Sequence, residues 1–198
     1  MAVDRDGLLD EDDHEDANGV YLVDDIHNFD SEIPVHLQEI ASATEVGDVN
    51  ALRLALDNLN GSINEPIEDG DTALHLVCLY GYFPCVKLLV ERGADIEAKD
   101  EDGAIPLHDA CAGGFWEIVM FLLNCADDNV VKRMLETVDS EGDTPLHHAA
   151  RGEHVDVIRA LLTHGASTEI RNFELMKPGD LSDPHTEARR LLESAVSL

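Results

Sequence analysis

The side chains best suited to chemistry in this chain are its ten histidines and four cysteines. His75, His108 and His147 stand at the same place in three similar segments, which is typical of a repeated structural position. The chain contains no H-E-x-x-H sequence, and the adjacent His147 and His148 point to different sides of a helix. We therefore predict no metal site and no cofactor.

The cysteines likewise form no catalytic or metal-binding pattern. Cys78, Cys85, Cys111 and Cys125 include no C-x-x-C pair, which favours buried, reduced thiols. Neither a G-x-S-x-G sequence nor a Walker loop occurs. His108 and Cys111 have the residue types of a base and a nucleophile, but their recurrence at a fixed period explains both. The sequence predicts a protein that is not an enzyme.

The charge balance indicates what kind of partner the chain can bind. It has 42 acidic and 13 basic residues, for a net charge of −29. Such a chain repels nucleic acids and anionic membranes, so we expect neither as a partner. A protein with a basic surface is the easiest electrostatic fit. With no visible signal peptide and no apolar run of about 18 residues, we expect a cytoplasmic or nuclear location.

An internal repeat determines the fold class. The segments DGDTALH (69–75), DGAIPLH (102–108) and EGDTPLH (141–147) are 33 and then 39 residues apart, so the last interval contains a six-residue insertion. A weaker copy follows at 177–180, and a degenerate copy precedes them at 40–64. Periods of this length indicate a solenoid of stacked units.

Each copy predicts a turn followed by two helices. An acidic residue and a glycine supply the turn, a Thr-Pro pair such as Thr144-Pro145 suits a helix start, and Gly81 and Gly114 end the first helix in a left-handed conformation. Apolar residues at helical spacing mark both helices. The expected first helices are Leu74–Tyr80, Leu107–Gly113 and Leu146–Gly152, and the expected second helices are Pro84–Arg92, Trp116–Cys125 and Val155–His164.

The T-P-L-H signature and the 33-residue period resemble the ankyrin repeat over roughly residues 36–198. The resemblance implies an all-α solenoid of about five helix-turn-helix repeats, the outer two degenerate, with short β-turn tips. It also implies that the repeated histidine hydrogen-bonds backbone groups near the turns. The expected repeats are 36–66, 67–99, 100–138 with the insertion, 139–171, and 172–198 as a C-terminal cap.

Three positions depart from this pattern. Ile105 replaces the threonine and loses a capping hydroxyl, Glu153 stands where glycine usually ends the first helix, and Leu175 replaces the turn glycine. The degenerate outer repeat that contains Leu175 suits the end of a solenoid.

The resemblance further implies that a partner binds along the concave side, formed by the turn tips and the first helices. A mixed acidic and apolar groove there suits a basic segment with apolar anchors, although acidic tips are also common as solvated positions. Trp116 is either an interface residue or a core residue. The expected partner-binding residues are Glu68, Asp69, Asp71, Glu101, Asp102, Glu141 and Asp143 at the tips and Leu79, Tyr80, Ala112 and Arg151 on the first helices.

Two segments lie outside the repeat pattern. Residues 1–35 carry 12 acidic side chains and one arginine, which predicts a disordered segment. Its apolar island, 20–23 with Ile26 and Phe29, is either a docking motif or part of a solubilising tail. The insertion at 124–138 predicts either an extra helical turn packed on its own repeat, which we favour, or a protruding hook for the partner.

These observations together predict a monomeric, non-catalytic adaptor or regulator that binds a basic protein. The alternative is an assembly chaperone that transiently shields a subunit of a larger complex. A transient association with subassemblies alone would distinguish the chaperone from a permanent adaptor.

Overall fold

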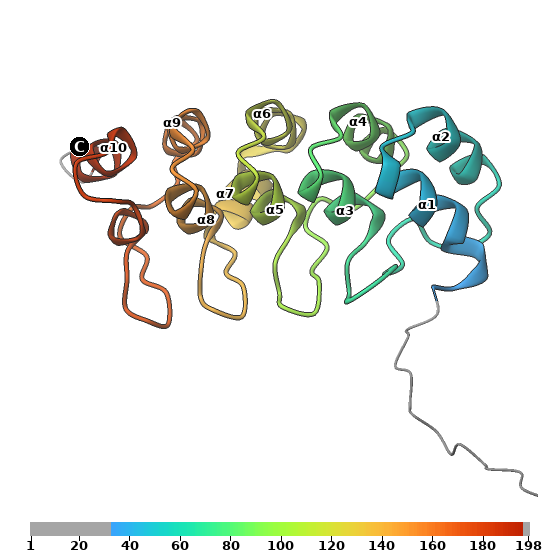
Figure 1. Cartoon of the computed structure of the whole chain (residues 1–198), viewed down its shortest axis with the longest axis horizontal. Coiled ribbons are helices and arrows are strands. Elements are labelled where there is room, and N and C mark those ends of the chain that lie inside the picture. The colour runs from blue at the N-terminus through green and yellow to red at the C-terminus, as the bar shows by residue number, and fades with distance from the viewer. Residues whose placement is uncertain (1–32, 196–198) are drawn as a thin grey trace, which may run out of the picture. The chain divides into compact units, whose positions relative to one another are not determined.

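The computed structural model describes residues 33–195, which form two rows of stacked helices (Figure 1). A short 3₁₀ helix, η1 (Val35–Leu37), comes first. The row nearer the tip loops contains α1 (Gln38–Val46), α3 (Ala73–Leu79), α5 (Pro106–Ala112), α8 (Pro145–Arg151) and the 3₁₀ helix η2 (Pro178–Leu181). The other row contains α2 (Val49–Asp57), α4 (Phe83–Glu91), α6 (Trp116–Cys125), α9 (Val155–Thr163) and α10 (Glu187–Ala195).

This arrangement confirms the expected helical solenoid, and most observed helix ends lie within one residue of the predicted ones. No strand is assigned between residues 33 and 195, where an isolated bridge joins Glu68 and Asp71 at one tip. The predicted disordered segment 1–35 lies outside the described residues except for its last three. The apolar island also lies outside them, so its role stays a prediction.

The shared core is a row of aliphatic side chains along the stack. Leu74, Leu107 and Leu146 are all buried at the same place in successive repeats. α3 packs on α5, α5 on α8, and α8 on η2, so each layer covers the apolar face of its neighbour. Since a single pair of short helices cannot bury such a face, the repeats stabilise one another.

The left-handed positions persist even where glycine is absent. Gly81 and Gly114 end their helices with φ angles of 77° and 71°, as predicted. Glu153 occupies the same position with a φ of 55°, and Leu175 keeps the turn conformation with a φ of 64°. A non-glycine residue costs roughly 1–2 kcal/mol in this conformation, so packing of the neighbouring repeats must outweigh local preference at both places.

The insertion forms an additional helix, α7 (Asp128–Glu136), which is longer than the single turn we favoured. Asp127 caps its start by accepting hydrogen bonds from two backbone N–H groups. Val131, Met134 and Leu135 are buried in the core. The guanidinium of Arg133 binds both carboxylate oxygens of Glu97, at 2.9 and 2.7 Å. The insertion is therefore packed against the solenoid.

The prediction of buried cysteines is correct for three of the four. Cys78, Cys85 and Cys111 are buried free thiols, whereas Cys125 is exposed at the end of α6, because the chain leaves the helix there. Trp116 is half-exposed, so core packing does not account for its whole side chain. None of the helices in the described part of the chain is both long and apolar enough to cross a membrane.

Candidate functional site

The three repeated histidines join each repeat to the turn of the next. In each, Nδ1 accepts a hydrogen bond from the backbone N–H three residues earlier, at 3.0–3.2 Å, so the ring proton is on Nε2. Nε2 donates to a backbone oxygen of the following repeat. Those oxygens belong to Ala104, Asp143 and Met176 and accept from His75, His108 and His147, respectively. These bonds confirm the structural role that the resemblance implies.

Burial lowers the pKa of all three histidines, to about 4 for His108, where the nearby His148 contributes as well. The rings are therefore neutral at pH 7, and both nitrogens of each ring are engaged in hydrogen bonds. Each ring therefore links its own helix start to the tip loop of the next repeat.

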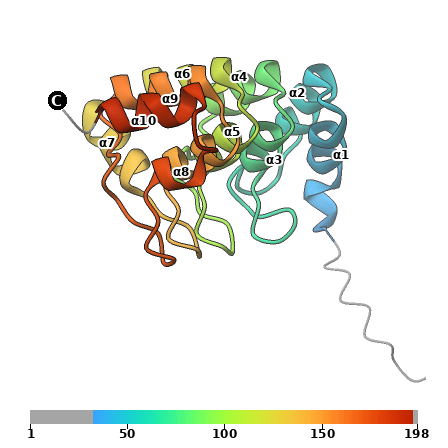
Figure 2. The same cartoon turned by 60° about the vertical axis from the view of Figure 1, so that its left-hand side comes forward.

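The tip loops project to one side of the helix rows (Figures 1 and 2). We call the tip loops and the exposed ends of α3, α5 and α8 the tip surface. Most of the predicted partner-binding residues are exposed on it. They are Glu68, Asp69, Glu101, Asp102 and Glu141 in the loops and Leu79, Tyr80, Ala112 and Arg151 on the helices, while Asp71 is half-buried.

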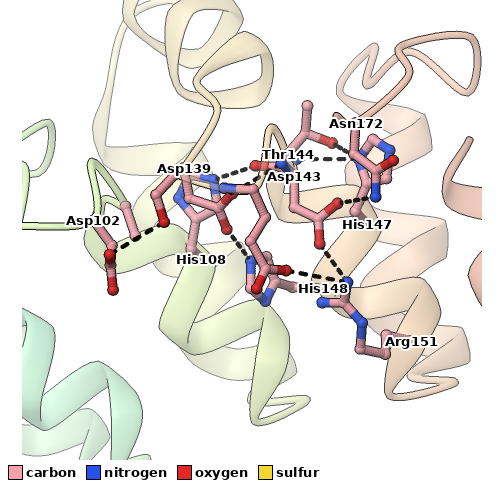
Figure 3. Close-up of polar contacts among 12 residues, drawn as sticks. Asp102, His108, Asp139, Asp143, Thr144, His147, His148, Arg151 and Asn172 are labelled. Atoms are coloured by element: carbon pink, nitrogen blue, oxygen red, sulfur yellow. Dashed lines mark hydrogen bonds and ion pairs between the residues drawn. The ribbon is translucent and has the colours of Figure 1, made fainter. Parts of the chain in front are cut away.

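Asp143 is the exception. We predicted that it is exposed at a tip, and this prediction was wrong. Its side chain is 0% exposed. Arg151 donates to Oδ2 at 2.5 Å, and the amide of Asn172 donates to Oδ1 at 2.8 Å (Figure 3). A buried carboxylate needs such partners, since desolvation is costly without them. An arginine eight residues later in the same repeat is the sequence signal that identifies this internal ion pair.

Asp143 belongs to a group of compensated charges, which we call the second acidic cluster: Asp139 and Asp143 with His148, Arg151 and Asn172 (Figure 3). Asp139 Oδ2 lies 2.7 Å from His148 Nε2, and its Oδ1 accepts from two backbone N–H groups at 2.9 Å. Burial acts to raise the pKa of Asp139, but these bonds outweigh it and the pKa is lowered. Every carboxylate in this cluster thus has a positive or hydrogen-donating neighbour.

Another group of carboxylates lies between repeats two and three and has no ion pair among the described residues, although Asp100 Oδ1 accepts a hydrogen bond from the N–H of Ala104 at 2.8 Å. We call Asp71, Asp100 and Asp109 the first acidic cluster, because these residues precede those of the second cluster in the chain. Carboxylate oxygens of Asp71 and Asp100 and a ring nitrogen of His75 lie within 4.8 Å of one another. Asp109 Oδ2 is buried without a hydrogen-bond partner. Among residues 33–195, no lysine, arginine or histidine forms an ion pair with these three carboxylates.

The pKa values reflect this difference. Burial, followed by repulsion from Asp100 and other nearby carboxylates, raises the pKa of Asp71 to about 6. Burial, followed by repulsion from Asp71 and Asp100, raises the pKa of Asp109 to about 8. Our sequence reasoning missed Asp100 and Asp109. The signal was present, because Asp109 occupies the repeat position where His148 stands 39 residues later.

Both clusters contain residue types that can bind a cation, but their hydrogen bonds argue against a metal. In the first, both ring nitrogens of His75 are already bonded to the backbone. In the second, Arg151 and Asn172 occupy the oxygens of Asp143. The first cluster differs from the second in that it has no ion pair among residues 33–195, and Leu79 and Tyr80 are exposed at the end of α3.

Comparison with known proteins agrees with the repeat architecture. A family model described as "Ankyrin repeats (3 copies)" matches residues 39–130 and 99–172. The chain is 37% identical over 59 residues to the acyl-CoA-binding domain-containing protein 6 homolog of Dictyostelium discoideum, covering 30% of this chain and 20% of that protein. It is 47% identical over 36 residues to the probable E3 ubiquitin-protein ligase XBOS33 of Oryza sativa subsp. japonica, covering 18% and 7%. The chain thus spans a fifth or less of these relatives.

Proposed function

Because the chain belongs to the ankyrin-repeat family, whose repeats are protein–protein interaction modules, we propose that it is a non-catalytic adaptor or regulator. On this proposal it binds a basic segment of a partner protein along the tip surface. The matches cover only 20% and 7% of the two relatives, so the acyl-CoA-binding and ubiquitin-ligase descriptions of those proteins are not transferred to this chain.

The first acidic cluster is the observation that supports this proposal most directly. Its carboxylates repel one another, and the tip residues Asp69 and Glu68 add further negative charge beside Asp71. A lysine or arginine of a partner would relieve this repulsion, and a bound cation favours the ionised form of a carboxylate. Binding of a basic segment would therefore lower the pKa of Asp71 and Asp109.

Exposed apolar side chains next to this charge provide anchors for the same segment. Leu79 and Tyr80 are half-exposed at the end of α3, and the ring of Tyr80 lies 5.8 Å from that of Tyr82. Tyrosine is enriched among residues that contribute most to binding energy, and charged neighbours chiefly affect the association rate and specificity. We expect Tyr80 to contribute affinity and the acidic tips to select a basic partner.

A charge-reversal experiment tests the proposal. The partner is first isolated with the full-length chain, and its affinity is then measured for a variant with Asp69→Lys, Glu101→Lys and Glu141→Lys. We expect at least a tenfold loss of affinity and a weaker dependence on salt. A matched variant with Glu91→Lys, Glu117→Lys and Asp156→Lys changes the net charge by the same amount at exposed positions of α4, α6 and α9, away from the tip loops. Equal affinities for the two variants would refute the proposed surface.

We also propose that the protein acts as a monomer in the cytoplasm or the nucleus. The lack of cysteine pairing in the described residues is compatible with a reducing compartment, and the negative charge opposes self-association. Sedimentation of the purified full-length chain and microscopy of the tagged protein in its native cells would test both statements.

A further inference from the structure

The two ends of the described solenoid have different surfaces. At the N-terminal end, three large apolar side chains are exposed: Val35 (82%), Val46 (69%) and Leu54 (64%). At the C-terminal end, the exposed Phe173 (73%) and Leu175 (71%) lie in the last tip loop, whereas the terminal helix α10 contributes no large exposed apolar side chain. The terminal unit of a solenoid normally presents a polar outer face to water, so the apolar N-terminal face requires an explanation.

This face is also hollowed. Between α1 and α2 lies a groove of about 480 Å³, which we call the end groove. Its lining includes the small or apolar side chains Ser42, Ala43, Val46, Ala51, Leu54 and Ala55. Small residues along the floor with larger apolar residues beside them leave room for a row of side chains from another helix. None of the lining residues belongs to the tip surface.

The charges of the end groove indicate which occupant fits. Glu39 and Asp48 contribute to its lining, and no lysine or arginine does so among the described residues. The carboxylate of Asp48 is held in place because Oδ1 accepts hydrogen bonds from the N–H groups of Asn50 and Ala51. Neither Glu39 nor Asp48 forms an ion pair within residues 33–195.

Two candidate occupants of the end groove, a second copy of this chain and residues 1–32, are acidic and therefore match its charge poorly. A second copy of this chain would bring a net charge of −29 and place the same two carboxylates at the interface. Residues 1–32 of this chain are also strongly acidic. Like charges at an interface oppose association, whereas a basic flank would pair with Glu39 and Asp48.

We propose that the end groove is a second docking site, which receives an amphipathic helix of another protein with an apolar row and flanking lysine or arginine residues. The apolar row packs on Val46 and Leu54, and the basic flank pairs with Glu39 and Asp48. Because this site shares no residue with the tip surface, the protein can hold two partner segments at once.

Amide chemical shifts of the ¹⁵N-labelled full-length chain test this site. The probe is a 14-residue peptide of leucine and lysine, ordered so that a helix has one apolar face. A peptide with glutamate in place of lysine is its control. We expect the lysine peptide to cause saturable shifts at Val46, Ala51 and Leu54, and the glutamate peptide to bind at least tenfold more weakly.

Substitutions in the chain complete the test. Leu54→Lys should weaken binding of the lysine peptide at least tenfold, whereas Val138→Lys, which adds the same charge at another exposed apolar position, should leave it unchanged. Shifts confined to the tip surface, or equal binding of both peptides, would overturn the proposal. Without peptide, concentration-dependent shifts in the groove would overturn it in favour of a second copy. Changes at residues 1–32 in the Leu54→Lys variant would overturn it in favour of that segment.

Discussion

The two acidic clusters occupy corresponding parts of different repeats, yet only one is neutralised from within the chain. Asp71 and Asp143 stand at the same repeat position. Eight residues later the second repeat has Leu79 and the fourth has Arg151, so only Asp143 has an arginine beside it. The same backbone therefore carries an ion pair in one layer and, in another, a carboxylate without an ion-pair partner among the described residues.

The difference extends to the next carboxylate in each cluster. Asp139 has His148 as its partner, whereas Asp109 takes the position of that histidine and faces Asp71 and Asp100. A buried carboxylate among like charges destabilises the folded state, and natural proteins tolerate such local conflicts chiefly at functional sites. The comparison teaches that the second cluster joins neighbouring repeats through paired charges, whereas the first has no ion-pair partner among the described residues.

The largest effect is expected from breaking the compensated cluster. Arg151→Ala leaves the buried carboxylate of Asp143 with only Asn172 as a side-chain donor. Removing one partner of a buried pair typically costs 3–5 kcal/mol, and because Arg151 is half-exposed we expect about 2–3 kcal/mol. Urea unfolding at pH 7 measures this loss.

The control for that measurement is Arg159→Ala, which breaks an ion pair with Glu187 in which both side chains are exposed. Surface pairs of this kind contribute about 0–1 kcal/mol. If the two substitutions lower the free energy of unfolding equally, the second cluster is not a stabilising unit.

An intermediate effect of opposite sign is expected in the first cluster. In the unfolded chain Asp109 ionises near pH 4, but in the folded chain it keeps its proton up to about pH 8. The free energy of unfolding of the native protein should therefore fall as the pH rises from about 4 to about 8. Asp109→Asn removes this penalty, so we expect the variant to be more stable by about 2 kcal/mol at pH 7.5 and to have no advantage at pH 4.

Thermal unfolding at a series of pH values checks this expectation. Asp156→Asn, at an exposed position on α9, serves as the control and should follow the native protein throughout. Parallel curves for the native protein and Asp109→Asn between pH 4 and pH 8 would show that Asp109 is not held protonated.

The smallest effect on stability is expected when the first cluster is given an arginine at the repeat position that Arg151 occupies in the second. Leu79→Arg places a guanidinium at the position that Arg151 occupies relative to Asp143. We expect the pKa of Asp71 to fall from about 6 toward its ordinary value, with a gain in stability below 1 kcal/mol. The same change should weaken binding of a basic partner.

Carbon-detected NMR titration of the Asp71 carboxyl measures that pKa. The matched variant Leu79→Gln adds polarity without charge and should leave the value near 6. If the pKa of Asp71 falls equally in both variants, the difference between the two clusters is due to exposure to water and not to charge compensation.

The role of the repeated histidines was implied by the resemblance to the ankyrin repeat. The sequence alone determined the repeat and the helix positions. These follow from local chemistry: glycine or a tolerated substitute at the left-handed positions, proline at helix starts, and leucine at the stacking position of Leu74, Leu107 and Leu146. Such features recur in each unit and need no knowledge of its neighbours.

Only the tertiary structure decided which charges are compensated. Asp143 and Asp71 belong to the same sequence pattern, but burial and the presence of Arg151 and Asn172 made one an internal residue. Asp109 acquired its raised pKa chiefly from burial and further from repulsion by Asp71 and Asp100. Electrostatic energies depend on distance and on exclusion of water, and both are set when residues far apart in sequence are packed together.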